Sequence, residues 1–310
     1  MKFNNLKGSL ILLTAALLWG LAFVAQSAAA ELVPTFIFNA LRSMIGVAVL
    51  YLFLIITNKG KKVRFFPEDK KERKIYYKSA LCCGGCLVVA MSLQQYGITI
   101  YPKGVSSEAR AGFITSLYVI LVPIVSVFAK KKIMAEIWFA VLIALSGVYM
   151  LCFSGGVSGI YAGDLLIFLC VISFTLHILS IDKFVGFTGG VKLSIMQFAV
   201  CSIVSLILSL IFEFNDINWL NVARAMPQIA YMGVMSSGVA YTLQIIGQKY
   251  AEPAVASISM SFESVFAALG GWVISGNALS GREILGCCLV FAAIIVAQIP
   301  EFRKKTKQIA

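Results

Sequence analysis

Long apolar stretches, separated by short polar loops, run through almost the whole chain. A hydrocarbon core about 30 Å thick is spanned by about 20 helical residues, and the stretches have about this length. Only helices and closed barrels satisfy backbone polar groups in lipid, and these stretches lack the alternation of barrel strands. The pattern therefore predicts an all-α membrane protein with ten transmembrane helices, at residues 8–28, 35–56, 77–100, 109–129, 134–153, 163–184, 190–212, 226–248, 254–275 and 282–299.

The composition agrees with this class. Hydrophobic residues make up 60% of the chain and charged residues 13%, with a mean hydropathy of +0.90, whereas a soluble domain carries roughly 25% charged residues. The net charge is +12. Lys and Arg lie between the apolar stretches rather than along one face, so the expected partner is the lipid bilayer and not nucleic acid. All eight cysteines lie within apolar stretches, which predicts buried packing residues rather than disulfides or a metal site.

The basic loops predict the orientation of the chain. The loop at 58–78 is strongly basic and is assigned to the cytoplasm by the positive-inside rule. With that assignment, 21 of the 26 Lys and Arg residues lie on the cytoplasmic side, four lie on the other side, and Arg42 lies within a helix. An even number of helices then puts both termini in the cytoplasm, in a bacterial plasma (inner) membrane. The apolar run from Leu10 to Val24 is read as the first helix rather than a signal peptide, because the second half contains a counterpart.

An internal repeat divides the chain into halves at 1–155 and 156–310, the first with the basic loop 58–78 and the second with a basic tail. An offset of 155 relates Gly8 to Gly163, Asn39 to Ser194 and Arg42 to Gln197. An offset of 150 relates Gln94 to Gln244 and Gly97 to Gly247, and an offset of 145 relates Tyr118 to Glu263. Five helices is an odd number, so the second half enters the membrane from the opposite side. Such inverted repeats are typical of secondary transporters, whose sites lie near the midplane between the repeats.

Four segments resemble the EamA family of the drug/metabolite transporter superfamily. They are Leu17-Leu-Trp-Gly20, the run from Ala111 to Pro123, Gly163-Asp-Leu-Leu, and the run from Phe262 to Trp272. The resemblance covers nearly the whole chain as two EamA-type halves. It implies a transporter in which helices 1–4 and 6–9 surround a central cavity and helices 5 and 10 are peripheral. Ser264 departs from the family pattern, which usually has proline after the glutamate of helix 9.

Two ionisable residues lie deep within predicted helices, where insertion of a charge costs about 2.5–3.5 kcal/mol. Glu263 could bind an amine-bearing substrate or exchange a proton during the cycle. The structural alternative is a neutral acid hydrogen-bonded to serines such as Ser259. Arg42 faces the same way as Asn39 and could hold a substrate carboxylate with its guanidinium fork. Alternatively, Arg42 pairs with Glu263 or extends toward the headgroups.

Uncharged polar and aromatic residues are further candidates for substrate binding or coupling. His177 is the only histidine and could relay protons, although a lone histidine is more often a packed, hydrogen-bonded residue. Trp19 lies too deep for an interfacial belt and could contact a substrate amine through its ring. Polar stripes on helices either line a wet cavity or join neighbouring helices. The remaining candidates are Gln94, Tyr118, Gln197, Tyr241 and Gln244, with Ser237 and Gln248 on the helical face of the last two.

The expected function is secondary transport. Walker, GxSxG and HExxH patterns are absent from the sequence, so we expect no ATP hydrolysis by that route, no enzyme activity and no cofactor. Coupling would then come from protons or from exchange. The substrates expected are small metabolites, amino acids or related amines, carried outward by a monomer or homodimer. The alternatives are an importer or exchanger on the same scaffold and, from another class, a membrane enzyme acting on a lipid-linked substrate.

Overall fold

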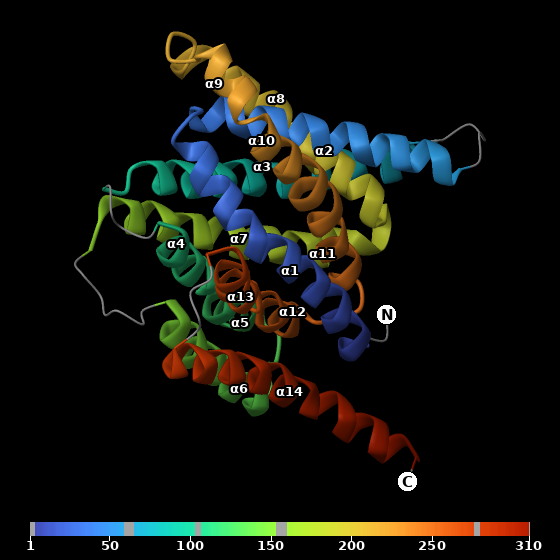
Figure 1. The fold of residues 1–310 in the computed structure, drawn as a ribbon. Coiled ribbons are helices and arrows are strands. Elements are labelled where there is room, and N and C mark those ends of the chain that lie inside the picture. Colours follow the sequence, from blue (N-terminus) through green and yellow to red (C-terminus); the bar gives the residue numbers. More distant parts are fainter. Residues whose placement is uncertain (1–3, 59–64, 103–106, 153–159, 276–279, 310) are drawn as a thin grey trace.

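The computed structural model describes residues 4–58, 65–102, 107–152, 160–275 and 280–309. This part of the chain is almost entirely helical (Figure 1). Eight of its helices are long and apolar enough to cross a membrane, and two shorter apolar helices, Ala135–Met150 and Pro253–Leu269, bring the apolar helical segments to ten. The predicted fold class is confirmed. The two chain ends lie toward the same side of the bundle in Figure 1.

The helices follow the predicted segments closely. Those of the first half are α1 (Asn5–Ala30), α2 (Thr35–Thr57), α3 (Lys70–Thr99), α4 (Ser107–Ser116), α5 (Tyr118–Phe128) and α6 (Ala135–Cys152). Those of the second half are α7 (Ala162–Thr188), α8 (Gly190–Phe212), α9 (Trp219–Arg224), α10 (Met226–Tyr231), the π-helix η1 (Met232–Ala240), α11 (Tyr241–Gln248), α12 (Pro253–Met260), α13 (Glu263–Ser275) and α14 (Gly281–Ile309). The helix α3 begins before the predicted residue 77 because Asp69 caps it, accepting a hydrogen bond from the backbone N–H of Glu72 at 2.8 Å. Part of the predicted loop 58–78 is therefore helical.

Two segments are interrupted at matching positions in the two halves. The fourth predicted segment is broken at Leu117, between α4 and α5, and the ninth at Ser261 and Phe262, between α12 and α13. The offset of 145 that relates Tyr118 to Glu263 also relates Leu117 to Phe262. Interrupted helices are a recurrent feature of transporter sites. Here each interruption places one candidate residue at the first position of the helix that follows.

The helices form two bundles with equivalent contacts. In bundle A (α3, α4, α5, α7 and α8), α7 packs against α3, α4 and α5, and α8 packs against α3. In bundle B (α1, α2, α10, η1, α11, α12 and α13), α1 packs against η1, α11, α12 and α13, and α2 packs against η1. The helices α2 and α8 pack against each other and join the bundles. The helices α6 and α14 pack together at one edge of the molecule, the peripheral position that the resemblance implies (Figure 1).

Two close glycine contacts recur at the offsets read from the sequence. A Cβ atom added at Gly163 would lie 2.7 Å from the carbonyl oxygen of Gly97, and one added at Gly8 would lie 2.9 Å from that of Gly247. Gly8 corresponds to Gly163 at an offset of 155, and Gly97 to Gly247 at 150. Because real Cβ atoms essentially never approach other atoms within 3.0 Å, glycine is needed for α3 to meet α7 and for α1 to meet α11. The repeat positions therefore make equivalent contacts.

Candidate functional site

A cavity lies between bundles A and B. Its volume available to the centres of water molecules is about 50 Å³. One water needs about 10–15 Å³ by this measure, so the cavity has room for a few waters but not for a solute with a large side chain. Its lining comprises Trp19, Ala22, Phe23, Gln26, Arg42, Met232, Ser236, Tyr241, Gln244, Met260 and Glu263 from bundle B, and Gln94, Thr115, Tyr118, Phe174 and Ile178 from bundle A.

Arg42 brings a positive charge to the cavity from α2. The residue is 3% exposed, and its Nε atom has no hydrogen-bond partner. The guanidinium carbon lies 5.4 Å from the centroid of the Phe38 ring, a contact that stabilises a cation modestly. Among the residues that the structure describes, no carboxylate forms an ion pair with Arg42. A buried guanidinium in this setting is suited to two hydrogen bonds with a carboxylate.

Glu263 brings a carboxyl group to the same cavity from the start of α13. The residue is 4% exposed, and its Oε1 accepts a hydrogen bond from the hydroxyl of Tyr118 at 3.0 Å. Ser259 is hydrogen-bonded to Ser9 at 2.8 Å rather than to Glu263, and Glu263 forms no ion pair with Arg42 in the described part of the chain. The bond to Tyr118 joins bundle B to bundle A across the cavity.

Gly20, in the Leu17-Leu-Trp-Gly20 segment, allows α1 to approach α13 at the site. A Cβ atom added at Gly20 would lie 2.7 Å from the carbonyl oxygen of Glu263 and from the backbone nitrogen of Ala267. Any side chain here would push the start of α13 away from α1. This glycine therefore helps to set the position of the Glu263 carboxylate.

Aromatic rings and the π-helix shape the remaining wall. The rings of Trp19 and Tyr241 pack edge to face with centroids 4.8 Å apart, and Tyr241 also packs on Phe198 at 5.3 Å. Ser236 lines the cavity in place of the predicted Ser237. The reason is the π-helix η1, whose wider turn shifts the face expected from an α-helical period.

The structure brings seven of the ten predicted site residues to this cavity: Trp19, Arg42, Gln94, Tyr118, Tyr241, Gln244 and Glu263. The other three lie outside its lining. His177 and Gln197 are fully buried and hydrogen-bonded to each other, Nε2 to Oε1, at 3.0 Å. Asn39 is fully buried with no partner for its side-chain amide. Gln248 donates to the carbonyl oxygen of Ile178 at 3.1 Å instead of lining the cavity. The side chain of Trp272 lies outside the described residues.

Sequence reasoning missed three polar lining residues, Gln26, Thr115 and Ser236. For Gln26 the signal was present, because it lies seven residues after Trp19, on the same helical face. Thr115 precedes the break between α4 and α5, and the π-helix carries Ser236. Neither the break before α5 nor the π-helix can be predicted from the spacing of apolar residues in the sequence.

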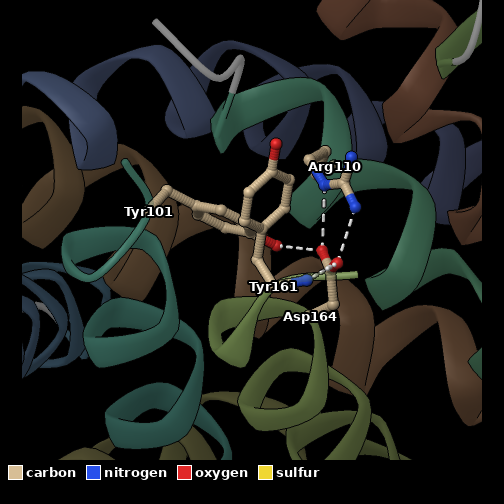
Figure 2. Close-up of polar contacts among 4 residues, drawn as sticks. All are labelled: Tyr101, Arg110, Tyr161 and Asp164. Atoms are coloured by element: carbon tan, nitrogen blue, oxygen red, sulfur yellow. Dashed lines mark hydrogen bonds and ion pairs between the residues drawn. The ribbon is translucent and has the colours of Figure 1, made fainter. Parts of the chain in front are cut away.

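A second polar cluster lies within bundle A, where α3 ends and α4 and α7 begin (Figure 2). The Arg110 guanidinium binds the Asp164 carboxylate through Nε at 2.9 Å and Nη2 at 2.6 Å. Tyr101 donates its hydroxyl to Asp164 at 2.6 Å, and the ring of Tyr161 stacks near Arg110, 4.7 Å from the guanidinium carbon. Burial, followed by the hydrogen bond to Asp164, raises the pKa of Tyr101 above its ordinary value, so the hydroxyl stays protonated. These contacts hold together the end of α3 and the starts of α4 and α7, all within bundle A.

Comparison with known proteins identifies the family. The profile of the EamA-like transporter family matches residues 6–153 and again residues 161–298. The chain belongs to the EamA-like transporter family. It is 26% identical over 306 residues to an "uncharacterized transporter" of Archaeoglobus fulgidus, covering 96% of this chain and 87% of the relative. It is 22% identical over 301 residues to the "uncharacterized transporter YoaV" of Bacillus subtilis, covering 95% of this chain and 97% of the relative.

A similar fold is also seen in a solved structure. One crystal structure, 20% identical in sequence, is similar with a TM-score of 0.75 over 96% of this chain and 98% of the other. Family membership, the relatives and the apolar helices together identify a multi-pass membrane transporter. The cavity between bundles A and B lies within both family matches, which contribute residues to it from each half.

Proposed function

We propose that this EamA-family protein is a secondary-active, alternating-access transporter that carries small metabolites, amino acids or closely related amines, through the cavity between its bundles. One observation carries the proposal. A buried guanidinium, Arg42, and a buried carboxyl group, Glu263, line the same cavity and are not paired with each other. A solute with a carboxylate and an ammonium group could bind both.

The free energy of burial supports a zwitterionic substrate. An isolated buried charge is unfavourable by several kcal/mol even after relaxation. A solute carboxylate would supply the missing counter-charge to Arg42, and a solute ammonium group would stabilise the ionised form of Glu263. A carboxylate can bind the Arg42 fork in two hydrogen bonds, while an ammonium group can bind the Glu263 carboxylate in place of the Tyr118 hydroxyl. Trp19 and Phe23 supply an apolar and aromatic surface for the rest of the solute, and a ring face also attracts an amine.

The two-bundle architecture supports alternating access. The cavity lies at the boundary of bundles A and B, and its present volume requires them to separate before a larger solute can enter. We take the two halves to be inverted repeats in a bacterial inner membrane with both termini in the cytoplasm. The positive-inside distribution of Lys and Arg supports that orientation. We propose net export, driven by proton coupling at Glu263 or by exchange.

Flux into proteoliposomes tests the proposed function. The panel contains labelled α-amino acids, the amines that lack their carboxylates and the acids that lack their amino groups, each with and without a pH gradient. Saturable flux of at least one amino acid or amine is expected, exceeding that of the matched deaminated acid. Protein-free liposomes and liposomes with the double variant R42Q/E263Q are the controls. Flux no greater than in these controls across the whole panel would contradict the proposal.

A further inference from the structure

A lattice of side-chain amides joins the two bundles at one end of the cavity. Nε2 of Gln26, in bundle B, donates to Oε1 of Gln94 at 3.3 Å and to Oε1 of Gln95 at 3.2 Å. Nε2 of Gln95 donates to the carbonyl oxygen of Gln26 at 3.2 Å, and Nε2 of Gln94 donates to the hydroxyl of Thr115 at 3.0 Å. All four residues are buried. The lattice therefore connects α1 to α3 and α4 without any charged group.

The lattice lies between the cavity and one surface of the molecule. Gln26 and Gln94 line the cavity and are four and five residues from the ends of their helices, Ala30 and Thr99. Beyond them, Ser27 of α1 and Ser107 of α4 are hydrogen-bonded at 2.9 Å. These ends belong to the extracytoplasmic side in the proposed orientation. A solute leaving the cavity on that side has to pass between α1 and the helices α3 and α4.

The second half has apolar residues at two of the three positions equivalent to Gln26, Gln94 and Gln95, and Gln94 corresponds to Gln244. The repeat offsets of 155 and 150 relate Gln26 to Ile181 and Gln95 to Ile245. Ile181, of bundle A, and Ile245, of bundle B, are fully buried in one apolar cluster. Three linked amides therefore join the bundles at one end of the cavity. At the other end aliphatic side chains replace two of them, and a single amide, that of Gln248, bonds across to the carbonyl oxygen of Ile178.

We propose that Gln26, Gln94 and Gln95 form the extracytoplasmic gate of this transporter, opening when bundle A and bundle B separate at this end. The inference rests on the proposed alternating-access function and orientation. Opening exchanges amide–amide bonds for bonds to water, so little net free energy is lost. Opening at Ile181 and Ile245 instead exposes apolar surface to water, which is unfavourable in proportion to its area. The glutamine end is therefore the more easily hydrated.

A disulfide across the gate tests the proposal. The double variant S27C/S107C, in a background with the native cysteines replaced, puts two small thiols where two hydroxyls are 2.9 Å apart between the bundles. The matched control is S9C/S259C, which replaces hydroxyls 2.8 Å apart within bundle B alone. Oxidation of S27C/S107C is expected to lower flux at least about tenfold, which is the effect of stabilising the closed state by about 1.4 kcal/mol or more. Reduction is expected to restore flux, and oxidation of the control to leave it within about twofold.

A second readout separates failure of the gate from failure of the proposed function. A cysteine at Ser236, inside the cavity, is labelled from the extracytoplasmic side with a membrane-impermeant maleimide and quantified by mass spectrometry of its peptide. The cross-link between positions 27 and 107 should protect it, and the control cross-link should not. Full flux and full labelling in the cross-linked protein would overturn the gate. Absence of flux from the reduced protein would count against the proposed function, while labelling would still decide on the gate.

If S27C/S107C does not fold, the variant Q26I/Q95I replaces the gate residues with those of the second half. Extracytoplasmic labelling of the cysteine at Ser236 and the maximal flux are both expected to fall several-fold, because opening then exposes apolar surface. Unchanged labelling and flux in folded Q26I/Q95I would overturn the proposal.

Discussion

Replacing Arg42 with glutamine removes the cation that is proposed to bind the substrate carboxylate. The residue is 3% exposed and is not paired with an acid of the described chain. The substitution should therefore weaken substrate binding rather than break an ion pair within the protein. A hydrogen bond to a charged group contributes about 1.5–3 kcal/mol, which corresponds to about 10- to 150-fold in affinity. An amino acid should lose this factor in R42Q. The corresponding amine, which has no carboxylate, should lose little.

The assay compares the two substrates in the same vesicles. The concentration giving half-maximal flux is measured for an amino acid and for its decarboxylated amine, with the wild type and with R42Q. The increase caused by R42Q for the amino acid is then divided by the increase for the amine. Arg42→Lys is the matched variant, because it keeps the charge without the planar fork. Its affinity for the amino acid should lie between those of the wild type and R42Q. Equal weakening of both substrates, with unchanged thermal stability, would refute the assignment of Arg42 to the carboxylate.

Three further predictions concern the rest of the site. Glu263→Gln keeps a hydrogen-bonding oxygen for the neighbouring tyrosine but removes the charge and the proton, so flux driven by a pH gradient should fall at least about tenfold; unchanged gradient-driven flux would refute coupling there. Gly20→Val should lower stability in thermal unfolding by about 1–3 kcal/mol, as for other overpacked sites, because its Cβ would meet the backbone of Glu263; Gly85→Val is the control, since a Cβ at Gly85 meets no atom within 4 Å. Tyr101→Phe should lower the free energy of unfolding by about 1.5–3 kcal/mol, and by the same amount at about pH 7 and about pH 9. The reason is that the pKa of Tyr101 is raised above the ordinary tyrosine value near 10, so its hydroxyl is protonated at both pH values. A loss of stability at only one of the two pH values would contradict this.

The helices could be predicted from the sequence because lipid imposes a simple rule on apolar length. Family membership followed from short segments such as Leu17-Leu-Trp-Gly20, and the structure assigns its glycine a close contact with the carbonyl oxygen of Glu263. The ionisable cavity residues Arg42 and Glu263 were also predictable. Inserting a charge into an apolar membrane segment is unfavourable, so such residues usually face a cavity or a partner. Arg42 and Glu263 are two of the seven candidates, out of ten, that line the cavity.

The interruptions of the helices were not predicted, and they decide which residues face the cavity. No proline marks the break at Leu117 or the one at Ser261 and Phe262. A weaker signal exists in hindsight, because Ser116 and Ser261 correspond at the offset of 145 and both hydroxyls bond to backbone carbonyl oxygens at 2.8 Å. Such bonds compete with regular helix. His177 is packed and hydrogen-bonded, as a lone histidine more often is, but its partner Gln197 lies on another helix and could not be identified from the sequence.

A structure of the protein with a transported solute bound would test the central claim most directly. The account predicts the solute between bundles A and B, with its carboxylate about 2.7–3.2 Å from the Arg42 guanidinium. Its ammonium group should lie at a similar distance from the Glu263 carboxylate, which the Tyr118 hydroxyl would then have released. A solute bound outside this cavity, or bound within it while touching neither Arg42 nor Glu263, would contradict the account.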